Sequence, residues 1–186
     1  DFCLSRGLGD VYKRQVSGER GIIASLQENP TQLTRVARTF GWTLDDRVTM
    51  MYRSPVDLYV DEWIYELLDA IDQLGAKRVL IDSLTDVLFA SGDEIRFREY
   101  MYSLIQRCSR AGVSLFMTSE LPDLFAVTRL SEYGVSHLSD NVLVLQYLRD
   151  EATIRRAITA LKTRASGNDP RCLLYTSPSP RDRQKS

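Results

Sequence analysis

Two side chains that could bind a metal ion follow a short apolar run in the segment Lys77–Leu84. The run covers residues 79–81, Val-Leu-Ile, and is typical of a strand buried on both faces of a parallel sheet. Asp82 and Ser83 come directly after it, at the end of the strand where open α/β sheets bind their ligands. A carboxylate and a hydroxyl are oxygen ligands of the kind that a nucleotide-bound Mg²⁺ needs. The alternative is that Asp82 only caps the loop after the strand.

Both ends of the chain look foreign to the fold. Residues 10–15 read as one translated strand of a common sequencing adaptor, and residues 172–177 read as the complementary strand in a shifted frame. Such segments are set aside before a fold is argued, so we expect non-native residues at 1–15 and 172–186 and a partial domain at 16–171. A natural disordered tail rich in Pro, Ser and Arg is the alternative at the C-terminal end. It does not explain the complementary relation between the two ends.

With those ends set aside, the remaining segment is acidic and poor in cysteine. Residues 16–171 carry a net charge of about −4 and a single cysteine, Cys108. The acidic balance argues against a protein that binds nucleic acid regardless of sequence. One cysteine supports neither a disulfide framework nor a metal cluster, and no apolar run approaches the ~18 residues of a membrane span. We therefore expect a cytoplasmic domain with a packed core.

Strand patterns and helix patterns alternate along this segment. Asn29-Pro30 predicts the start of the first helix, with an N-cap residue followed by a proline at the first helical position. Strands are expected at 21–26, 48–52, 77–82 and 113–118, and helices at 30–40, 60–74 and 93–112. This alternation predicts βαβ units around a parallel sheet. Two further β-rich runs, 141–148 and 153–164, predict an antiparallel hairpin added at the edge.

A series of short segments resembles the RecA-like ATPase domain of the KaiC family, in a branch of bacterial KaiC-like proteins. The matching segments are 24–30, 40–42, 52–58, 77–84, 97–100, 132–135, 139–142 and 161–164. Each is moderately specific, and their order and spacing over roughly 150 residues make the joint match strong. The resemblance implies an α/β, RecA-like three-layer domain with a mostly parallel central sheet and a C-terminal antiparallel β-hairpin. It also implies ATP and Mg²⁺ as ligands, and a homo-oligomeric ring, usually a hexamer, with ATP at the subunit interfaces.

The resemblance assigns roles to five residues. Asp82 matches the family's Walker B aspartate, which holds the magnesium ion. Gln27 and Glu28 match a pair of glutamates that orients and activates the attacking water. Lys162 and Arg164 match a basic pair that reaches the nucleotide of the neighbouring subunit, where a cation stabilises the charge that develops on the phosphoryl oxygens.

The same residues have simpler interpretations, which stay open. Glu28 could be an acidic residue favoured by the dipole of the helix that follows it. Lys162 and Arg164 share one face of a strand and could form a solvated strand edge.

Further nucleotide contacts are expected from polar residues at the ends of two strands. Ser83 follows the Walker B strand directly. Thr118, Ser119 and Glu120 end the fourth strand beside the expected nucleotide, where they could sense the γ-phosphate. The alternative is that these three residues merely start the next loop.

Three departures from the family pattern bear on activity. The phosphate-binding loop, Gly-x-x-x-x-Gly-Lys-[Ser/Thr], and the N-terminal strand before it are absent, so the chain by itself is expected to be inactive. Gln27 stands where the family has a glutamate, and an amide can orient a water but cannot accept its proton. Ser136-His137 stands where the clock members carry an autophosphorylated Ser-Thr pair, so that modification is not expected.

The leading hypothesis is a fragment of an ATP-hydrolysing, ring-forming regulatory ATPase that acts on protein signalling partners away from membranes. A non-catalytic module, which binds nucleotide to set its oligomeric state and partner affinity, is the alternative. Gln27 favours that alternative, so the residues leave open whether the parent protein is an enzyme. A DNA recombination protein of the RecA or RadA type would share the fold. The acidic balance and the lack of a basic, aromatic-laced loop argue against it.

Overall fold

The computed structural model describes residue 11 and residues 18–120, 138–150, 153–163 and 173–175. The chain forms two compact units, Asp1–Glu120 and Leu121–Ser186, and each is described here by itself.

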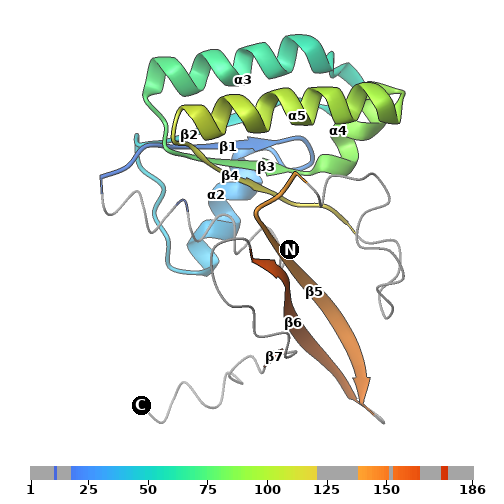
Figure 1. Cartoon of the computed structure of the whole chain (residues 1–186). Helices are drawn as coiled ribbons and strands as arrows, with labels where there is room; N and C mark the ends of the chain where they lie inside the picture. Colours follow the sequence, from blue (N-terminus) through green and yellow to red (C-terminus); the bar gives the residue numbers. More distant parts are fainter. Residues whose placement is uncertain (1–10, 12–17, 121–137, 151–152, 164–172, 176–186) are drawn as a thin grey trace. The chain divides into compact units, whose positions relative to one another are not determined.

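The first unit is built on a four-stranded parallel sheet in the order β2-β1-β3-β4 (Figure 1). The strands are β1 (Gly21–Ser25), β2 (Val48–Tyr52), β3 (Arg78–Asp82) and β4 (Ser114–Met117). All three pairings are parallel, which confirms the predicted βαβ organisation. The register places Ser25, Tyr52 and Asp82 side by side at the carboxyl ends of their strands.

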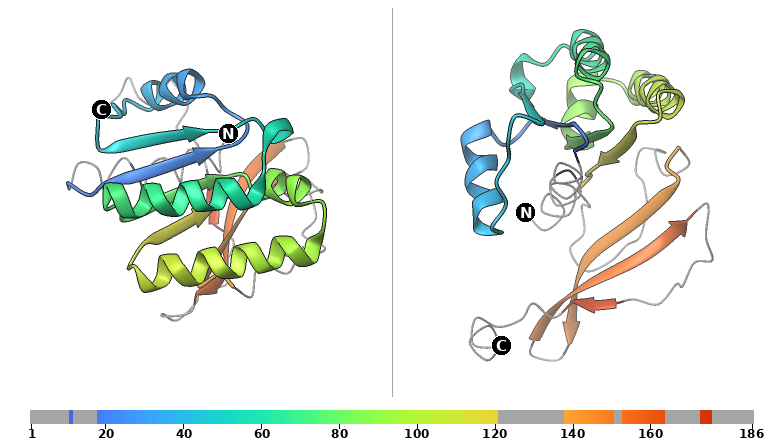
Figure 2. Two further views of the ribbon diagram at one scale, coloured as in Figure 1. Left: turned by 90° about the horizontal axis from the view of Figure 1, so that it is seen from above. Right: turned by 90° about the vertical axis from the view of Figure 1, so that its left-hand side faces the viewer.

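Helices cover both faces of this sheet. Figures 1 and 2 show α3 (Val60–Leu74) and α5 (Glu94–Arg110) over one face and α2 (Pro30–Thr39) over the other. All five residues of β1 are buried, as expected for a strand covered on both sides. Helix α3 buries Trp63, Leu67 and Ile71, and α5 buries Phe97, Met101 and Leu104.

Local chemistry explains where the helices begin and end. Asn29 caps α2 in a reciprocal capping box with Gln32, and Pro30 occupies the first turn. Asp93 caps α5 through Ile95 N, at 3.0 Å. Helix α3 stops at Gly75, whose φ of 61° lies in the left-handed region that favours glycine.

Two elements of the first unit were not predicted. A 3₁₀ helix, η1 (Pro55–Asp57), follows β2, and helix α4 (Leu84–Ser91) begins immediately after Ser83. Helix α4 was missed because its apolar sequence runs on from β3. Ser83, its N-cap residue, also makes no side-chain capping bond. The first turn of helix α4 comes directly after Asp82 and Ser83, which are predicted site residues.

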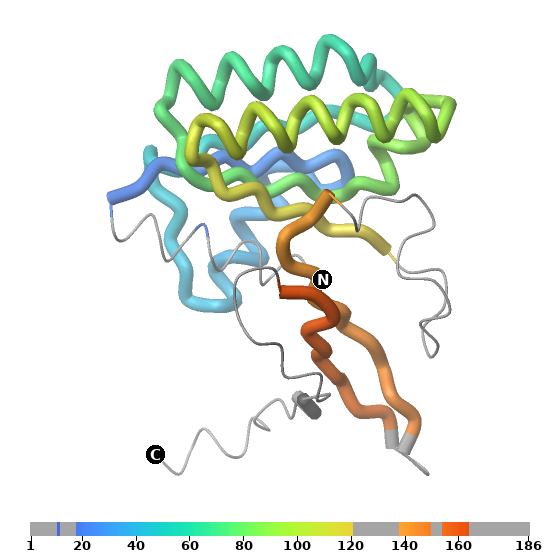
Figure 3. The backbone as a smooth tube through the Cα atoms, viewed as in Figure 1, coloured from blue at the N-terminus to red at the C-terminus, as the bar shows by residue number. Residues whose placement is uncertain are grey.

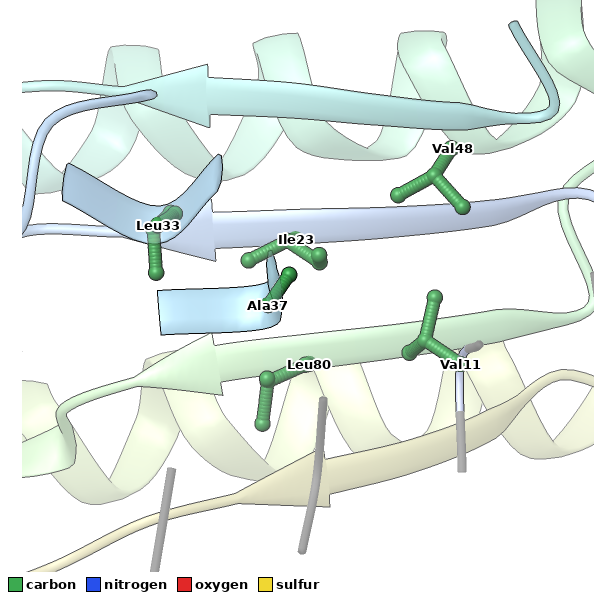
Figure 4. Close-up of a cluster of buried hydrophobic side chains, with 6 residues drawn as sticks. All are labelled: Val11, Ile23, Leu33, Ala37, Val48 and Leu80. Atoms are coloured by element: carbon green, nitrogen blue, oxygen red, sulfur yellow. The ribbon is translucent and has the colours of Figure 1, made fainter. Parts of the chain in front are cut away.

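A cluster of buried side chains joins α2 to the sheet (Figure 4). Leu33 and Ala37 of α2 pack with residues of β1, β2 and β3, namely Ile23, Val48 and Leu80. Val11 completes the cluster and is 1% exposed. Val11 lies in residues 1–15, which are expected to be non-native. Its place in the cluster is the same whatever the origin of those residues.

The second unit contains a three-stranded antiparallel sheet in the order β5-β6-β7 (Figure 1). β5 (Asn141–Asp150) and β6 (Thr153–Thr163) form a long hairpin (Figure 3), with an irregularity between Val142 and Leu143. The predicted antiparallel hairpin is therefore confirmed, but it was expected at the edge of the parallel sheet and belongs instead to a separate sheet. β7 (Leu173–Tyr175), which pairs with β6, was not predicted and lies in the C-terminal segment assigned to the adaptor.

None of the helices in the described ranges combines the length and the apolar character that crossing a membrane requires.

Candidate functional site

The carboxyl ends of β1, β3 and β4 are joined by backbone hydrogen bonds. Leu26 N donates to Asp82 O at 2.8 Å, and Leu84 N donates to Thr118 O at 2.9 Å. Thr118 N donates to Ile81 O at 3.1 Å. These three hydrogen bonds hold the segments that carry the predicted site residues at one edge of the sheet. The peptide bond between Asp82 and Ser83 is cis.

Asp82 lies at the centre of this edge, half-buried. Thr118 Oγ1 donates to Asp82 Oδ1 at 2.5 Å. Burial raises the pKa of the Asp82 carboxyl, the bond from Thr118 lowers it, and the nearby charges of Asp86 and Glu120 raise it. The net direction is upward, so Asp82 is a desolvated carboxylate to which a cation would be a favourable neighbour.

The residues that follow Thr118 face the solvent. Ser119 and Glu120 are exposed, and Glu120 reaches Asp82 only through its charge. Thr118 is thus the member of this trio that contacts the predicted metal ligand.

Gln27 and Glu28 leave β1 at the same edge. Glu28 N donates to the buried Ser25 Oγ at 3.1 Å, which folds the loop between β1 and α2. One carboxylate oxygen of Glu28, Oε2, is buried without a hydrogen-bond partner. An unpaired buried oxygen of this kind is costly unless a donor or a cation is supplied to it. Such an oxygen could accept a hydrogen bond from a ligand or contact a cation, so the predicted role of Glu28 stays open beside its place before α2.

Asp86 is the site residue that the sequence reasoning missed. Its Oδ2 accepts from Ser83 Oγ at 2.6 Å and from Gln27 Nε2 at 3.0 Å. It thereby joins the first turn of α4 to the loop after β1. The signal that could have found it is the spacing Ser-x-x-Asp over residues 83–86, which is typical of a helix start.

The oxygen-rich donor set fits a magnesium ion. Among the described residues, no group of three or more His, Cys, Asp or Glu side chains is placed to hold a metal. Mg²⁺ does not need such a group, because it is commonly held by one or two carboxylates together with waters and substrate phosphates. Asp82, with Ser83 next to it in the chain, matches that pattern, and Glu28 follows the strand that pairs with the Asp82 strand.

The predicted basic pair belongs to the second unit. Lys162 is half-buried on β6, and its Nζ donates to Ser139 O of the same unit at 2.8 Å. Arg164 lies outside the described residues. The role of both residues at a neighbouring subunit stays a prediction.

Comparison with known proteins agrees with this architecture. The family model described as "ATPase: KaiC" matches residues 11–176. The circadian clock oscillator protein KaiC of Prochlorococcus marinus is 30% identical over 162 residues, covering 80% of this chain and 32% of the relative. The circadian clock protein KaiC3 of a Synechocystis strain is 26% identical over 160 residues, covering 82% of this chain and 31% of the relative. The chain thus spans about a third of the length of these curated relatives.

A solved structure supports the fold. The crystal structure of a KaiC-like protein from the hyperthermophilic archaeon Pyrococcus horikoshii superposes with a TM-score of 0.78. The match covers 93% of this chain and 80% of that one, at 21% sequence identity. At this identity the likeness concerns the fold alone.

Proposed function

Because the chain belongs to the KaiC family of ATPases, we propose that it is the Mg²⁺-binding and water-orienting part of an ATP-hydrolysing domain. The observation that supports the proposal is the hydrogen bond from Thr118 to Asp82 at the carboxyl edge of β3 and β4, where Ser83 follows Asp82 and Glu28 follows the paired strand β1. Ligands of open α/β sheets bind at this edge. ATP-bound Mg²⁺ would supply charge neutralisation on the phosphoryl oxygens.

The surroundings of each residue suggest its role in this proposal. Asp82 and Ser83 supply oxygens to the ion and its waters, and Thr118 fixes the Asp82 carboxylate. Glu28, with its unpaired Oε2, accepts a proton from the water that Gln27 helps to orient. Ser119 and Glu120, exposed beyond Thr118, contact the nucleotide or its waters.

The assembled form we propose is a homo-oligomeric ring, hexameric in the parent protein. Lys162 and Arg164 would act on the nucleotide of the adjacent subunit. A cation supplied in this way typically contributes ~10³-fold or more when it is essential. The relatives bear the name of circadian clock proteins, which supports a regulatory role. Protein partners in the cytoplasm are part of the proposal.

The first test restores the upstream residues of the parent and measures Mg²⁺-dependent ATP turnover. Asp82→Asn should abolish turnover and leave the fold intact, because it removes a metal ligand and no core volume. Asp69→Asn, a matched change at an exposed position of α3, is the control. Near-normal turnover in Asp82→Asn would overturn the Walker B assignment. The chain by itself should show no saturable ATP binding by calorimetry, and clear binding would show that the site is misplaced.

The second candidate function is a nucleotide-dependent interaction module without turnover. The observation in its favour is that position 27 carries an amide, which can orient a water but cannot accept its proton. In the restored parent, Glu28→Gln should remove the residual hydrolysis and Gln27→Glu should raise it. Equal and unmeasurable rates in the parent and both variants would favour the module.

The trans role is tested by mixing subunits. Arg164→Ala should lower turnover and weaken nucleotide-dependent assembly, with little change in the melting temperature of the monomer. Mixing Arg164→Ala with Asp82→Asn subunits should restore activity in part, since some interfaces then pair an intact Asp82 with an intact Arg164. Co-assembled rings without any activity above that of the single variants would contradict the assignment.

A further inference from the structure

Asp86 receives two hydrogen bonds on one oxygen atom. Ser83 Oγ donates to Oδ2 at 2.6 Å from three residues before it, and Gln27 Nε2 donates to the same atom at 3.0 Å from the loop after β1. Asp86 is half-buried in the first turn of α4, next to Leu84 and Val87, which are buried in the core. The carboxylate therefore sits on a fixed element between two groups of the proposed site.

Without Asp86, the Gln27 amide and the Ser83 hydroxyl could each present either a donor or an acceptor to a ligand. A carboxamide presents an NH₂ donor or a carbonyl acceptor depending on its rotation, and a hydroxyl both donates and accepts. A carboxylate accepts only. Once Asp86 takes one Gln27 amide hydrogen and the Ser83 hydroxyl hydrogen, Ser83 Oγ has only its lone pairs left and the orientation of the Gln27 amide is fixed, with Oε1 as its acceptor and one Nε2 hydrogen still free to donate.

We propose that Asp86 is a positioning residue that turns Gln27 and Ser83 into acceptors for a hydrated magnesium ion and the attacking water. The inference rests on the proposed function and deepens it. With Asp86 in place, Asp82, Ser83, Glu28 and Gln27 all present acceptor oxygens toward water and cation. Without it, Gln27 can present its NH₂ group instead, which repels a cation and donates to the wrong side of a water.

Asp86 also explains how Gln27 is tolerated in place of a glutamate. Two carboxylates at positions 27 and 86 would face each other across 3.0 Å or so, with like charges and no donor between them. An amide at position 27 gives that contact a donor and keeps one oxygen for water. Gln27→Glu therefore removes this hydrogen bond and places two like charges together. The rise in hydrolysis expected of a base at position 27 should be larger in the double change Gln27→Glu with Asp86→Asn, which restores a donor and acceptor pair with the roles reversed.

The direct test is the side-chain amide resonance of Gln27 in ¹⁵N-labelled chain, assigned by its loss in Gln27→Ala. In the unmodified chain we expect two well-separated proton shifts with slowed solvent exchange. Asp86→Ala should move them to the positions of a solvent-exposed glutamine, and Asp69→Asn should leave them unchanged. Alanine favours helix, so α4 should persist, which the backbone spectrum verifies. A Gln27 resonance that is the same in Asp86→Ala as in the unmodified chain would overturn the proposal.

The second readout uses Mn²⁺ as a paramagnetic substitute for Mg²⁺, followed by the broadening of the Ser83 backbone amide. Asp86→Ala should raise the Mn²⁺ concentration for half-broadening by about tenfold, as expected when a residue that orients metal ligands is lost. Asp69→Asn should change it little. Unaltered Mn²⁺ affinity in Asp86→Ala would overturn the positioning role. Absence of preferential broadening at Ser83 in the unmodified chain would instead contradict the proposed metal site, and the Gln27 resonance would still decide on Asp86.

Discussion

Thr118 and Asp82, 36 residues apart in the chain, are joined by a hydrogen bond from the Thr118 hydroxyl to Asp82 Oδ1. The bond connects the end of β4 to the end of β3 beside the backbone bond from Thr118 N to Ile81 O. The bond lowers the pKa of the Asp82 carboxyl and so opposes the upward shift that burial causes.

Thr118→Val should therefore lower the free energy of unfolding by about 1 kcal/mol, because the half-buried Asp82 oxygen loses its donor while the side-chain shape is kept. Urea unfolding followed by tryptophan fluorescence measures the change. Thr118→Ser, which keeps the hydroxyl, is the control and should stay close to the original value. If valine and serine gave the same stability, the hydroxyl bond would contribute nothing.

Val11 and Gly21 form a contact that a double-mutant cycle can measure. A Cβ placed on Gly21 would lie 2.7 Å from Val11 Cγ1, and Val11 is buried against Ile23 and Leu80. Val11→Ala should cost about 2 kcal/mol of stability as a large-to-small core change, and Gly21→Ala about 1 to 3 kcal/mol through overpacking.

The combined variant of Val11 and Gly21 should be more stable than the sum of the two losses predicts, because removing the Val11 methyl groups makes room for the new Cβ. Val56→Ala is the control for Val11, since Val56 is 91% exposed and should change stability little. Strict additivity in thermal unfolding would show that Val11 does not pack against Gly21.

The buried Cys108 thiol should make the stability of the chain depend on pH. Burial raises the pKa of its thiol to about 11, with a smaller contribution from the charge of Asp72. The thiol therefore contributes its full stability below the ordinary value of 9.0, and that contribution is lost as the pH rises through about 11. Unfolding between pH 8 and 11 should show a steeper loss of stability in the original chain than in Cys108→Ala.

Thiol labelling gives an independent measurement of the same group. In a chain carrying Cys3→Ser and Cys172→Ser, iodoacetamide at pH 8 should modify Cys108 far more slowly than in the same chain unfolded in urea, because reaction requires an accessible thiolate. Equal rates in the folded and unfolded chains would contradict the buried, neutral thiol.

The ion pair between Arg53 and Glu66 should contribute little. Arg53 NH2 lies 2.6 Å from Glu66 Oε2, and the two side chains are 38% and 40% exposed. Glu66→Gln should cost no more than about 1 kcal/mol, and the cost should shrink at high salt. A loss well above 2 kcal/mol that persists at high salt would show that the pair acts as a buried one.

The sequence by itself determined the parallel sheet, most of its helices and the hairpin. Runs such as residues 79–81 predict strands because a strand covered on both faces is apolar throughout and because these runs are too short for a helix. The N-cap of α2 and the glycine that ends α3 can likewise be predicted from the sequence, since capping depends on residue types within a few positions. Asp82 could be selected for the same reason, because it directly follows such a strand.

Only the tertiary structure decided which side chains meet at the edge of the sheet. Gln27 and Asp86 are 59 residues apart, and no local pattern relates them. They meet because the strand order places β1 beside β3, so that the loop after β1 faces the first turn of α4. That turn was itself hidden, since its apolar residues continue the run of β3 and Ser83 gives its hydroxyl hydrogen to Asp86 instead of capping the helix. Short-range rules see caps and periodicity, whereas contacts between strand ends depend on the order of the strands, and that order is set by packing.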